Sequence, residues 1–247
     1  MSDQVETNSI HFILQGKGGV GKSLVASLLA QYLQGRGLQV HCFDTDPINA
    51  TLAGYEALDA VALDIMSGDD IDPRRFDQLM DAIIELPADA HVVVDNGASS
   101  FVPLGSYLLD NQALKVLEEH GHSVMLHTVV TGGQAILDTL SGLKSLVSHF
   151  PTTPIVVWLN RYFGDIAIDG KRFEEFKIYA ECASSFHAVI SLPHRKQTTF
   201  GRDLEELFAR RQTFTEAQGS DLPIMVRQRL TSFWRDTVTE MDQARLC

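Results

Sequence analysis

Short apolar runs rich in β-branched residues alternate along this chain with longer stretches of helical periodicity. The runs are residues 11–15, 38–44, 91–96, 122–130, 154–160 and 187–193. Strands that are apolar on both faces and alternate with helices are typical of a parallel sheet covered on both sides. The sequence therefore predicts an α/β fold with a mostly parallel central sheet and helices on both faces. Its 247 residues suit one domain, residues 1–247.

The charge balance limits the classes of partner. The chain carries 32 acidic and 20 basic residues, a net charge of −12. A field of this sign repels nucleic acids and anionic membranes at long range, so direct nucleic-acid binding is disfavoured. Three scattered cysteines show neither metal-site spacing nor a disulfide framework. The polar, acidic start of the chain differs from a signal peptide, and we expect a cytoplasmic protein.

The two ends of the chain carry different predictions. We expect residues 1–9 to form a flexible tail and residues 224–244 to form an amphipathic helix. One stripe of that helix holds the apolar residues Leu230, Phe233, Trp234, Val238 and Met241. Such a helix can touch a membrane, but its acidic residues weaken attraction to anionic lipid. Packing on the domain is therefore the favoured interpretation, and membrane contact is disfavoured.

A glycine-rich loop follows the first apolar run and precedes the first helical stretch. Gly16 and Gly21, followed by Lys22 and Ser23, match the Walker A pattern of a P-loop NTPase. Glycines allow backbone N–H groups to surround a phosphate, and the helix N-terminus adds partial positive charge. Lys22 would neutralise the phosphates and the Ser23 hydroxyl would join a Mg²⁺ shell. The alternative is a glycine-rich turn without a ligand. The remaining predicted backbone contacts are Gly18, Gly19, Val20 and Leu24.

A second lysine, Lys17, has no evident task in an ordinary Walker A loop. The sequence KGGVGKS resembles the deviant Walker A motif of the ParA/MinD family of dimeric ATPases. In that family the extra lysine reaches phosphates held by the other subunit. The resemblance implies that Lys17 acts on the partner's ATP and couples ATP binding to homodimer formation. The alternative is a solvated loop lysine.

The segment FDTDPINAT, residues 43–51, resembles the family's Asp-x-Asp-Pro segment. In the family the second acid orients the attacking water, which implies a catalytic role for Asp46 and a place near Mg²⁺. Phosphoryl transfer depends on positioning and charge placement more than on a strong base. The alternative is that Asp44 and Asp46 only cap a turn, because Asp-Pro suits a turn.

The segment HVVVDNGAS, residues 91–99, has the Walker B pattern of an apolar strand that ends in an acid. Asp95 would lie at the carboxyl end of the strand, where ligands bind in open α/β sheets, and would hold Mg²⁺ through water. Gly97 could offer its backbone N–H to the terminal phosphate. The family more often has Asp-Thr-Pro here, so the departure leaves this switch uncertain.

Two later positions correspond to the family's contacts with the base. Asn160 lies where the family has an asparagine that binds adenine, and Pro193 lies in a loop that closes over the base. Asn160 could instead only end its strand in a turn. We expect residues 194–196 to be a solvated loop. Leu24 replaces a hydroxyl residue that is frequent in the family, so only its backbone N–H would meet the α-phosphate.

Two features have no clear assignment from sequence. The pair Gly132–Gly133 indicates a close backbone approach, by a partner subunit or a nucleotide, or else a tight turn. The nine histidines show no metal-ligand spacing, and we expect His120 and His122 to be solvated.

Within the ParA/MinD family, DNGASSFVPL and HTVVTGGQAILDT resemble ATPases encoded with conjugative-transfer genes of broad-host-range plasmids. The resemblance implies a slow, Mg·ATP-dependent, dimerising ATPase switch whose partner belongs to the conjugation machinery or the relaxosome. That partner could recruit it to the inner membrane. Three alternatives remain open: a phosphoryl-transfer metabolic enzyme of the same superfamily, a plasmid partition or positioning protein, and a low-turnover nucleotide-binding scaffold.

Overall fold

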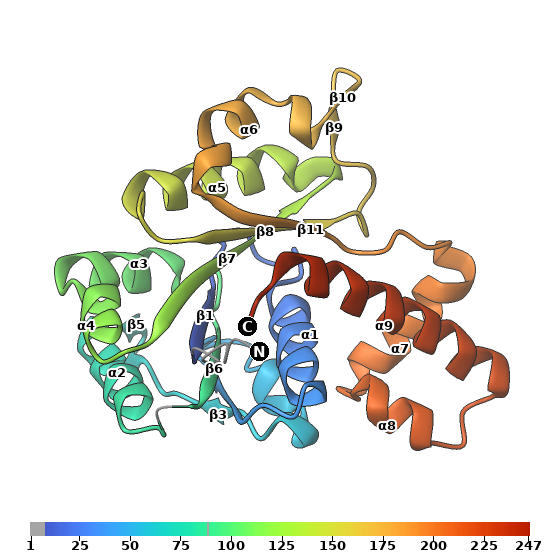
Figure 1. Cartoon of the computed structure of the whole chain (residues 1–247), viewed down its shortest axis with the longest axis horizontal. Helices are drawn as coiled ribbons and strands as arrows, with labels where there is room; N and C mark the ends of the chain where they lie inside the picture. The colour runs from blue at the N-terminus through green and yellow to red at the C-terminus, as the bar shows by residue number, and fades with distance from the viewer. Residues whose placement is uncertain (1–7, 88) are drawn as a thin grey trace, which may run out of the picture.

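A seven-stranded parallel sheet forms the centre of the protein, which a computed structural model describes for residues 8–87 and 89–247 (Figure 1). The strand order is β11-β8-β7-β1-β6-β2-β3, and every neighbouring pair is parallel. The strands are β1 (Ser9–Ile13), β2 (Val40–Asp44), β3 (Val61–Ala62), β6 (His91–Asp95), β7 (Ser123–Thr131), β8 (Ile155–Asn160) and β11 (Phe186–Ser191). The predicted α/β class is confirmed.

Each of the six apolar runs overlaps one strand, and β1, β7 and β11 extend up to two residues beyond their runs. All residues of β1, β6 and β8 are buried, as expected for strands covered on both faces. The edge strand β3 was not predicted, because it has only two residues and both are exposed. The sequence also missed two small hairpins outside the main sheet. They are β4 (Met66–Ser67) with β5 (Asp70–Ile71), and β9 (Ala167–Ile168) with β10 (Lys171–Arg172).

Helices cover the sheet in two groups (Figure 1). One group packs with the first apolar core: α2 (Phe76–Ile84), α3 (Phe101–Asp110), α4 (Ala113–Glu119), α5 (Ile136–His149) and α6 (Lys177–Cys182). The other packs with the second core: α1 (Lys22–Gly35), α7 (Arg202–Ala209), α8 (Phe214–Gly219) and α9 (Ile224–Ala244). Alternation along β1 separates the cores, because Phe12 joins the first and Ile13 the second.

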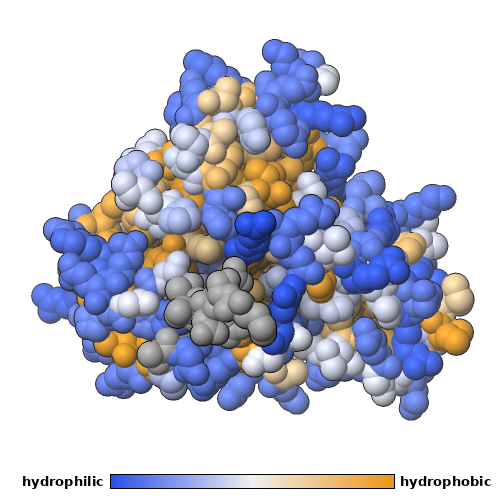
Figure 2. All heavy atoms as spheres, in the orientation of Figure 1, coloured by the Kyte–Doolittle hydropathy of each residue, from blue (hydrophilic) through white to orange (hydrophobic). Residues whose placement is uncertain are grey.

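The C-terminal helix α9 packs its apolar stripe on the domain. Leu230, Phe233 and Met241 are buried, while Trp234 and Val238 are partly buried against the same core. The outer surface of the α7–α9 lobe, at the right of Figure 2, is mainly hydrophilic. Among residues 8–87 and 89–247, no helix combines the length and apolar character needed to cross a membrane.

Residues 8 and 9, which we expected to belong to a flexible tail, are part of the folded domain. Residues 1–7 of the expected tail lie outside the described residues, but Asn8 is buried and Ser9 begins β1. The Asn8 amide contacts His122 Nδ1 at 2.8 Å. The prediction that His122 is solvated was therefore wrong, since its side chain meets Asn8 and is only 6% exposed, whereas His120 is exposed as expected.

A chain of buried polar side chains crosses four neighbouring strands. Trp158 Nε1 on β8 donates to His127 Nδ1 on β7, at 2.9 Å. His127 Nε2 lies 2.9 Å from His11 Nδ1 on β1, and His11 Nε2 lies 2.7 Å from the Ser9 hydroxyl. The hydroxyl lies 2.8 Å from His91 Nδ1 on β6. Because indole only donates, the contacts of both neutral imidazoles must run in one direction, each donating through Nε2.

Candidate functional site

The glycine-rich loop connects β1 to α1 and presents an unblocked helix N-terminus. Gly21 precedes the helix with φ of 104°, a conformation that L side chains rarely adopt. A Cβ at this position would also lie 2.8 Å from Asn160 Nδ2. No side chain caps α1 and no acidic residue lies in its first turn. The N–H groups of that turn therefore suit a bound anion such as phosphate.

Lys22 begins α1 and is 7% exposed. Its Nζ donates to the Lys17 carbonyl at 3.2 Å, which holds the ammonium within the curve of the loop. Burial lowers the pKa of Lys22, while the carboxylates of Asp95 and Asp46 oppose this effect. A buried ammonium without a close carboxylate partner at hydrogen-bond distance is well suited to phosphate.

Asp95 ends β6 as a fully buried carboxylate. Neither of its oxygens has a hydrogen-bond partner of good geometry among the described residues. Burial raises its pKa to about 7, although the nearby Ser23 hydroxyl and the Lys22 charge lower it in part. An unpaired buried carboxylate beside a hydroxyl offers the hard oxygen atoms that Mg²⁺ prefers, so these residues fit that ion.

The segment after β2 forms a turn that both of its aspartates stabilise. Asp44 accepts from the backbone N–H groups of Asp46 at 3.0 Å and Ala53 at 3.1 Å. Asp46 Oδ1 accepts from the backbone of Ile48 at 2.9 Å and Asn49 at 3.0 Å. The turn-capping interpretation therefore describes both residues. Asp44 is buried, whereas Asp46 is half-buried and also faces a cavity.

Two cavities adjoin at the loop. The first, of about 440 Å³, follows the start of α1 and the turn after β2, and we call it the phosphate cavity. It is lined by Gly18, Gly19, Gly21, Lys22, Ser23, Leu24, Asp46, Ile48, Asn49, Thr51, Ala98 and Ser99. The second, of about 350 Å³, shares Gly19, Gly21 and Leu24 with the first, and we call it the base cavity. The shared residues place the two cavities next to each other along the glycine-rich loop.

Apolar and aromatic walls surround the base cavity. Its other lining residues are Asn160, Arg161, Tyr162, Phe163, Leu192, Pro193, His194, Arg195, Gln197, Gly201, Leu204, Glu205, Phe208 and Phe233. Volume and lining of this kind suit a flat ring system with a few polar contacts. The sequence singled out only Asn160 and Pro193 for such a role. The aromatic residues of α7 and α9 escaped it because helical stripes look the same whether they line a cavity or a core.

Asn160 ties the base cavity to the phosphate loop. Its Nδ2 donates to the Val20 carbonyl at 2.9 Å, and its Oδ1 accepts from the Tyr162 backbone at 3.1 Å. The amide retains one N–H and one lone pair beyond these contacts. It can therefore hold the loop and still present a donor and an acceptor to a base.

The remaining predicted residues lie beside the cavities. Gly16, Lys17, Val20, Asp95 and Gly97 line neither of them. Gly97 is buried against the turn after β2. A Cβ there would lie 2.8 Å from Asp46 Cγ and 3.0 Å from Asp46 Cα. The glycine thus lets the segments after β2 and β6 touch.

A buried hydrogen-bond network that sequence reasoning missed joins those same two segments. The Thr45 hydroxyl donates to Asn96 Oδ1 at 3.1 Å, and the Ser100 hydroxyl donates to the same oxygen at 2.7 Å. Asn96 Nδ2 donates to the Gly97 carbonyl at 3.0 Å. Asn96, Gly97 and Ser100 fall within DNGASS, where the chain departs from the family's usual pattern. Asn96 and Ser100 therefore connect the segments after β2 and β6 by side-chain hydrogen bonds, where the family more often has Asp-Thr-Pro.

The pair Gly132–Gly133 is approached by the chain itself. A Cβ on Gly132 would collide with the carbonyl oxygens of Gly164 and Asp165, and one on Gly133 would lie 2.8 Å from the Phe163 carbonyl. The predicted close backbone approach is confirmed, and the segment that makes it is the chain's own loop after β8. The glycines thereby let the Tyr162–Phe163 wall of the base cavity sit close to β7.

Lys17 points away from its own phosphate cavity. Its Nζ pairs with Asp138 in the first turn of α5 at 2.8 Å, with side chains 45% and 56% exposed. Exposed ion pairs contribute about 0–1 kcal/mol, so this contact breaks readily. The lysine is therefore available for an anion that approaches from outside the subunit.

Comparison with known proteins agrees with this geometry. The family described as the CobQ/CobB/MinD/ParA nucleotide binding domain matches residues 11–177. The chain belongs to this family. Two proteins of Escherichia coli, each named protein TraL, are 51% and 48% identical to it. The first match covers 90% of this chain and 92% of the relative, and the second covers 95% and 98%.

Solved structures share the fold of this family member. A ParA family ATPase from Chlorobium tepidum TLS is 18% identical with a TM-score of 0.56, covering 96% of this chain and 99% of that one. The MinC:MinD cell division protein complex of Aquifex aeolicus contains a chain that is 15% identical with a TM-score of 0.54, covering 94% and 96%. The similarity extends over nearly the whole chain and shows that its fold is that of the P-loop NTPases.

Proposed function

We propose that this protein is a Mg·ATP-dependent, dimerising ATPase that acts as a switch in plasmid conjugative DNA transfer. The observation that carries the proposal is the phosphate cavity. The start of α1, whose N-terminus is unblocked, and the buried Lys22 ammonium line it, and the unpaired Asp95 carboxylate lies beside it, near Ser23 and Lys22. This combination suits a metal-bound polyphosphate better than an uncharged ligand.

Each residue of the phosphate cavity has a physical task in this proposal. The first turn of α1 binds phosphate oxygens through its N–H groups, and Lys22 neutralises their charge. Asp46, held by the turn that it caps, accepts a hydrogen bond from the attacking water and orients it. Hydrolysis yields ADP and phosphate, and such reactions need positioning more than a strong base.

Ser23 and Asp95 would hold Mg²⁺, with Asp46 nearby. A group of three or more His, Cys, Asp or Glu residues arranged to hold a metal ion is absent from the described residues. Mg²⁺ with a nucleotide needs only one or two protein carboxylates, because phosphates and water complete its shell. When bound, the ion neutralises the charge that develops on the phosphates.

Lys17 is the residue that we propose to link ATP binding to dimer formation. The lysine turns outward and is held only by an exposed ion pair with Asp138. We propose that it exchanges Asp138 for the phosphates of a second subunit's ATP, so that dimers form only with ATP. Hydrolysis then weakens the contact and releases the dimer with its bound partner. We place the partner within the conjugation machinery or the relaxosome because segments of this chain resemble ATPases encoded with conjugative-transfer genes.

Light scattering on a sizing column tests this switch with wild-type protein in the apo, ADP and Mg·ATP states. We expect a monomer in the first two states and a dimer with Mg·ATP. Lys17→Ala should remain monomeric with ATP, because it loses the only group proposed to bind the partner's phosphates. Its affinity for ATP as a monomer should stay within about threefold, since Lys17 lines neither cavity.

Lys144→Ala is the matched control, because this lysine lies on the exposed side of α5, outside both cavities. It should dimerise like the wild type. A dimer that forms equally without nucleotide, or that survives Lys17→Ala, would contradict the proposed switch.

Gly97→Ala is expected to slow ATP hydrolysis about 10- to 100-fold, because its Cβ would displace Asp46 from its position. Phosphate release measures the rate, and thermal melting follows the fold. Gly105→Ala on α3 serves as the control, since nothing lies within 4 Å of its added Cβ. Unchanged turnover in Gly97→Ala would argue against the placement of Asp46 at the reacting water.

A further inference from the structure

One side of the base cavity is formed by the segment between β11 and α7, residues 192–201, which we call the base loop; its second half, Gln197–Gly201, is a π-helical turn. Leu192, Pro193, His194 and Arg195 line the cavity from this loop, as do Gln197 and Gly201. The opposite wall comes from the segment after β8, which carries Tyr162 and Phe163. A ligand in the cavity therefore lies between two segments that are far apart in sequence.

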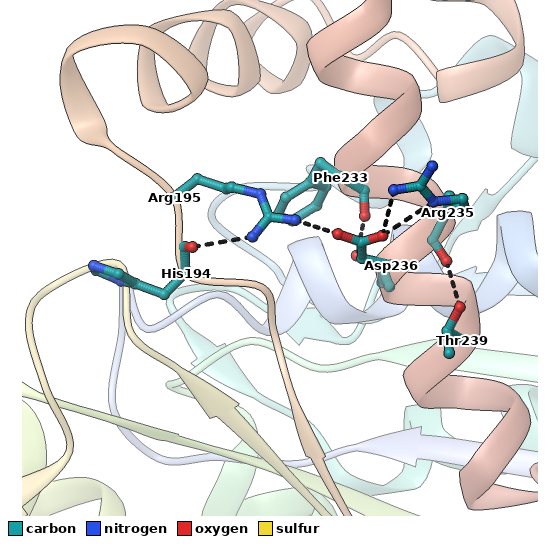
Figure 3. A network of polar contacts seen from close by, with 7 residues as sticks. His194, Arg195, Phe233, Arg235, Asp236 and Thr239 are labelled. Atoms are coloured by element: carbon teal, nitrogen blue, oxygen red, sulfur yellow. Dashed lines mark hydrogen bonds and ion pairs between the residues drawn. The ribbon is translucent and has the colours of Figure 1, made fainter.

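One end of the base loop is held firmly to the C-terminal helix. Figure 3 shows Arg195 reaching from the loop to Asp236 on α9. The other oxygen of Asp236 accepts from Arg235, at 3.0 and 3.1 Å, so the carboxylate is held from both sides. The Arg195 guanidinium also lies over the Phe200 ring at 5.6 Å. With side chains 29% and 34% exposed, this pair is less open to water than the Lys17–Asp138 pair, and it anchors the base loop to α9.

The other end of the base loop is joined to the opposite wall through one carboxylate oxygen. Glu205 Oε1, on α7, accepts from the Tyr162 hydroxyl at 2.5 Å and from Gln197 Nε2 at 2.6 Å. We call these three residues the clasp. The hydrogen bond to Glu205 raises the pKa of Tyr162. Tyr162 is 50% exposed, so water can compete for these contacts more easily than at the anchor.

The clasp connects the two walls across the cavity, because Tyr162 belongs to one wall and Gln197 and Glu205 to the other. A base seated between the walls cannot leave sideways while both contacts hold. Breaking the clasp frees the base loop to swing about the Arg195–Asp236 anchor. The geometry requires no movement of the phosphate loop.

We propose that the clasp of Tyr162, Glu205 and Gln197 is a gate that controls how fast a purine nucleotide leaves the site. This inference rests on the proposed function, since it assumes a nucleotide with its base in the base cavity. Glu205 acts as a positioning residue, through Tyr162 and the base loop. Release of ADP, rather than hydrolysis, is the step that the gate governs.

Stopped-flow fluorescence with N-methylanthraniloyl-ADP tests the gate, with excess unlabelled ADP chasing the bound probe. Tyr162→Phe keeps the ring and removes only the hydroxyl, and Glu205→Ala removes the shared acceptor. Each should speed dissociation about fivefold, as expected for a partly exposed hydrogen bond to a charged group. Because both changes break the same contact, the double variant should release the probe no more than about twofold faster than Glu205→Ala.

Glu206→Ala is the matched control. Its side chain lies next to Glu205 on α7, pairs with Arg210 and does not line the base cavity. It should release the probe at the wild-type rate. Melting temperatures of all variants establish that each is folded.

The outcomes separate the two proposals. Wild-type dissociation rates in both Tyr162→Phe and Glu205→Ala would overturn the gate while leaving nucleotide binding intact. Slower release, or equal acceleration by Glu206→Ala, would also overturn it. A wild-type protein that binds neither labelled ADP nor labelled ATP would instead overturn the proposed function, and the gate with it.

Discussion

Replacing Asp46 with asparagine is expected to lower the rate of ATP hydrolysis about 100-fold or more. The amide oxygen can still accept from the backbone of Ile48 and Asn49, so the turn after β2 should persist. What is lost is the charge that orients the attacking water. Phosphate release under single-turnover conditions measures the effect, and ATP affinity should change less than about threefold.

The same variant should accumulate as a dimer with ATP, because hydrolysis is the step proposed to release it. Asp64→Asn is a suitable control, since Asp64 Oδ1 likewise accepts a backbone N–H, from Met66 at 3.0 Å, and lines neither cavity. Wild-type turnover in Asp46→Asn would remove this residue from the reaction and leave it as a turn cap alone.

Replacing His127 with leucine is expected to lower the free energy of unfolding by about 2–6 kcal/mol. The change leaves the Trp158 indole N–H and His11 Nδ1 without their buried partner. Each unsatisfied buried polar group costs about 1–3 kcal/mol, and an entire domain is stable by only about 5–15 kcal/mol. Urea denaturation at pH 7.5 measures the difference.

The same substitution should make stability less sensitive to acid. Burial lowers the pKa of His11 to about 3 and that of His127 well below 6.5; His91 and His187 add to the effect on His11, and His11 and His187 add to the effect on His127. Below about pH 6.5 the unfolded chain therefore binds protons at both positions that the folded chain does not bind. Stability therefore falls as the pH is lowered through this window, by about 1.4 kcal/mol per pH unit for each histidine.

Asp95 contributes with the opposite sign. Its pKa, raised to about 7 by burial, makes the folded state bind a proton between about pH 7 and 3.8, so acid favours the folded state there. Asp95 makes this contribution in both the wild type and His127→Leu, so it cancels in the difference between their unfolding free energies at each pH. The slope of unfolding free energy against pH should therefore be about 1.4 kcal/mol per unit smaller in His127→Leu than in the wild type.

His120→Leu controls for the loss of a histidine as such, because His120 is exposed. It should leave the unfolding free energy at pH 7.5 within about 0.5 kcal/mol of the wild type. The slope of that free energy against pH should equal the wild-type slope. An equal slope in His127→Leu and wild type would mean that His127 takes up its proton in the folded state.

Local patterns in the sequence were enough to predict the central sheet and the phosphate loop. A strand buried on both faces needs a continuous apolar run, and a loop that surrounds phosphate needs glycines at fixed spacing. Both requirements are met by neighbouring residues, so they can be read without knowing the rest of the fold. The edge strand β3 escaped because two exposed residues carry no such pattern.

Side-chain contacts between residues far apart in the sequence could not be predicted from local patterns. The two E. coli TraL relatives and the family match support the resemblance from which the roles of Lys17, Asp46 and Asn160 were predicted. The sequence did not indicate that Asn160 would hold the Val20 carbonyl, or that Lys17 would pair with Asp138. Side-chain contacts of this kind depend on how loops from separate strands meet.

The sequence alone determined that this protein has a parallel sheet, a phosphate-binding loop and acids at the ends of two strands. Only the tertiary structure decided that Gly132–Gly133 meet the chain's own loop after β8, and that Trp158, His127 and His11 form one chain. The physical reason is how far apart in the sequence the interacting residues lie. Propensity and spacing act between neighbours in sequence, whereas burial and hydrogen-bond pairing across a sheet depend on the order and register of all its strands.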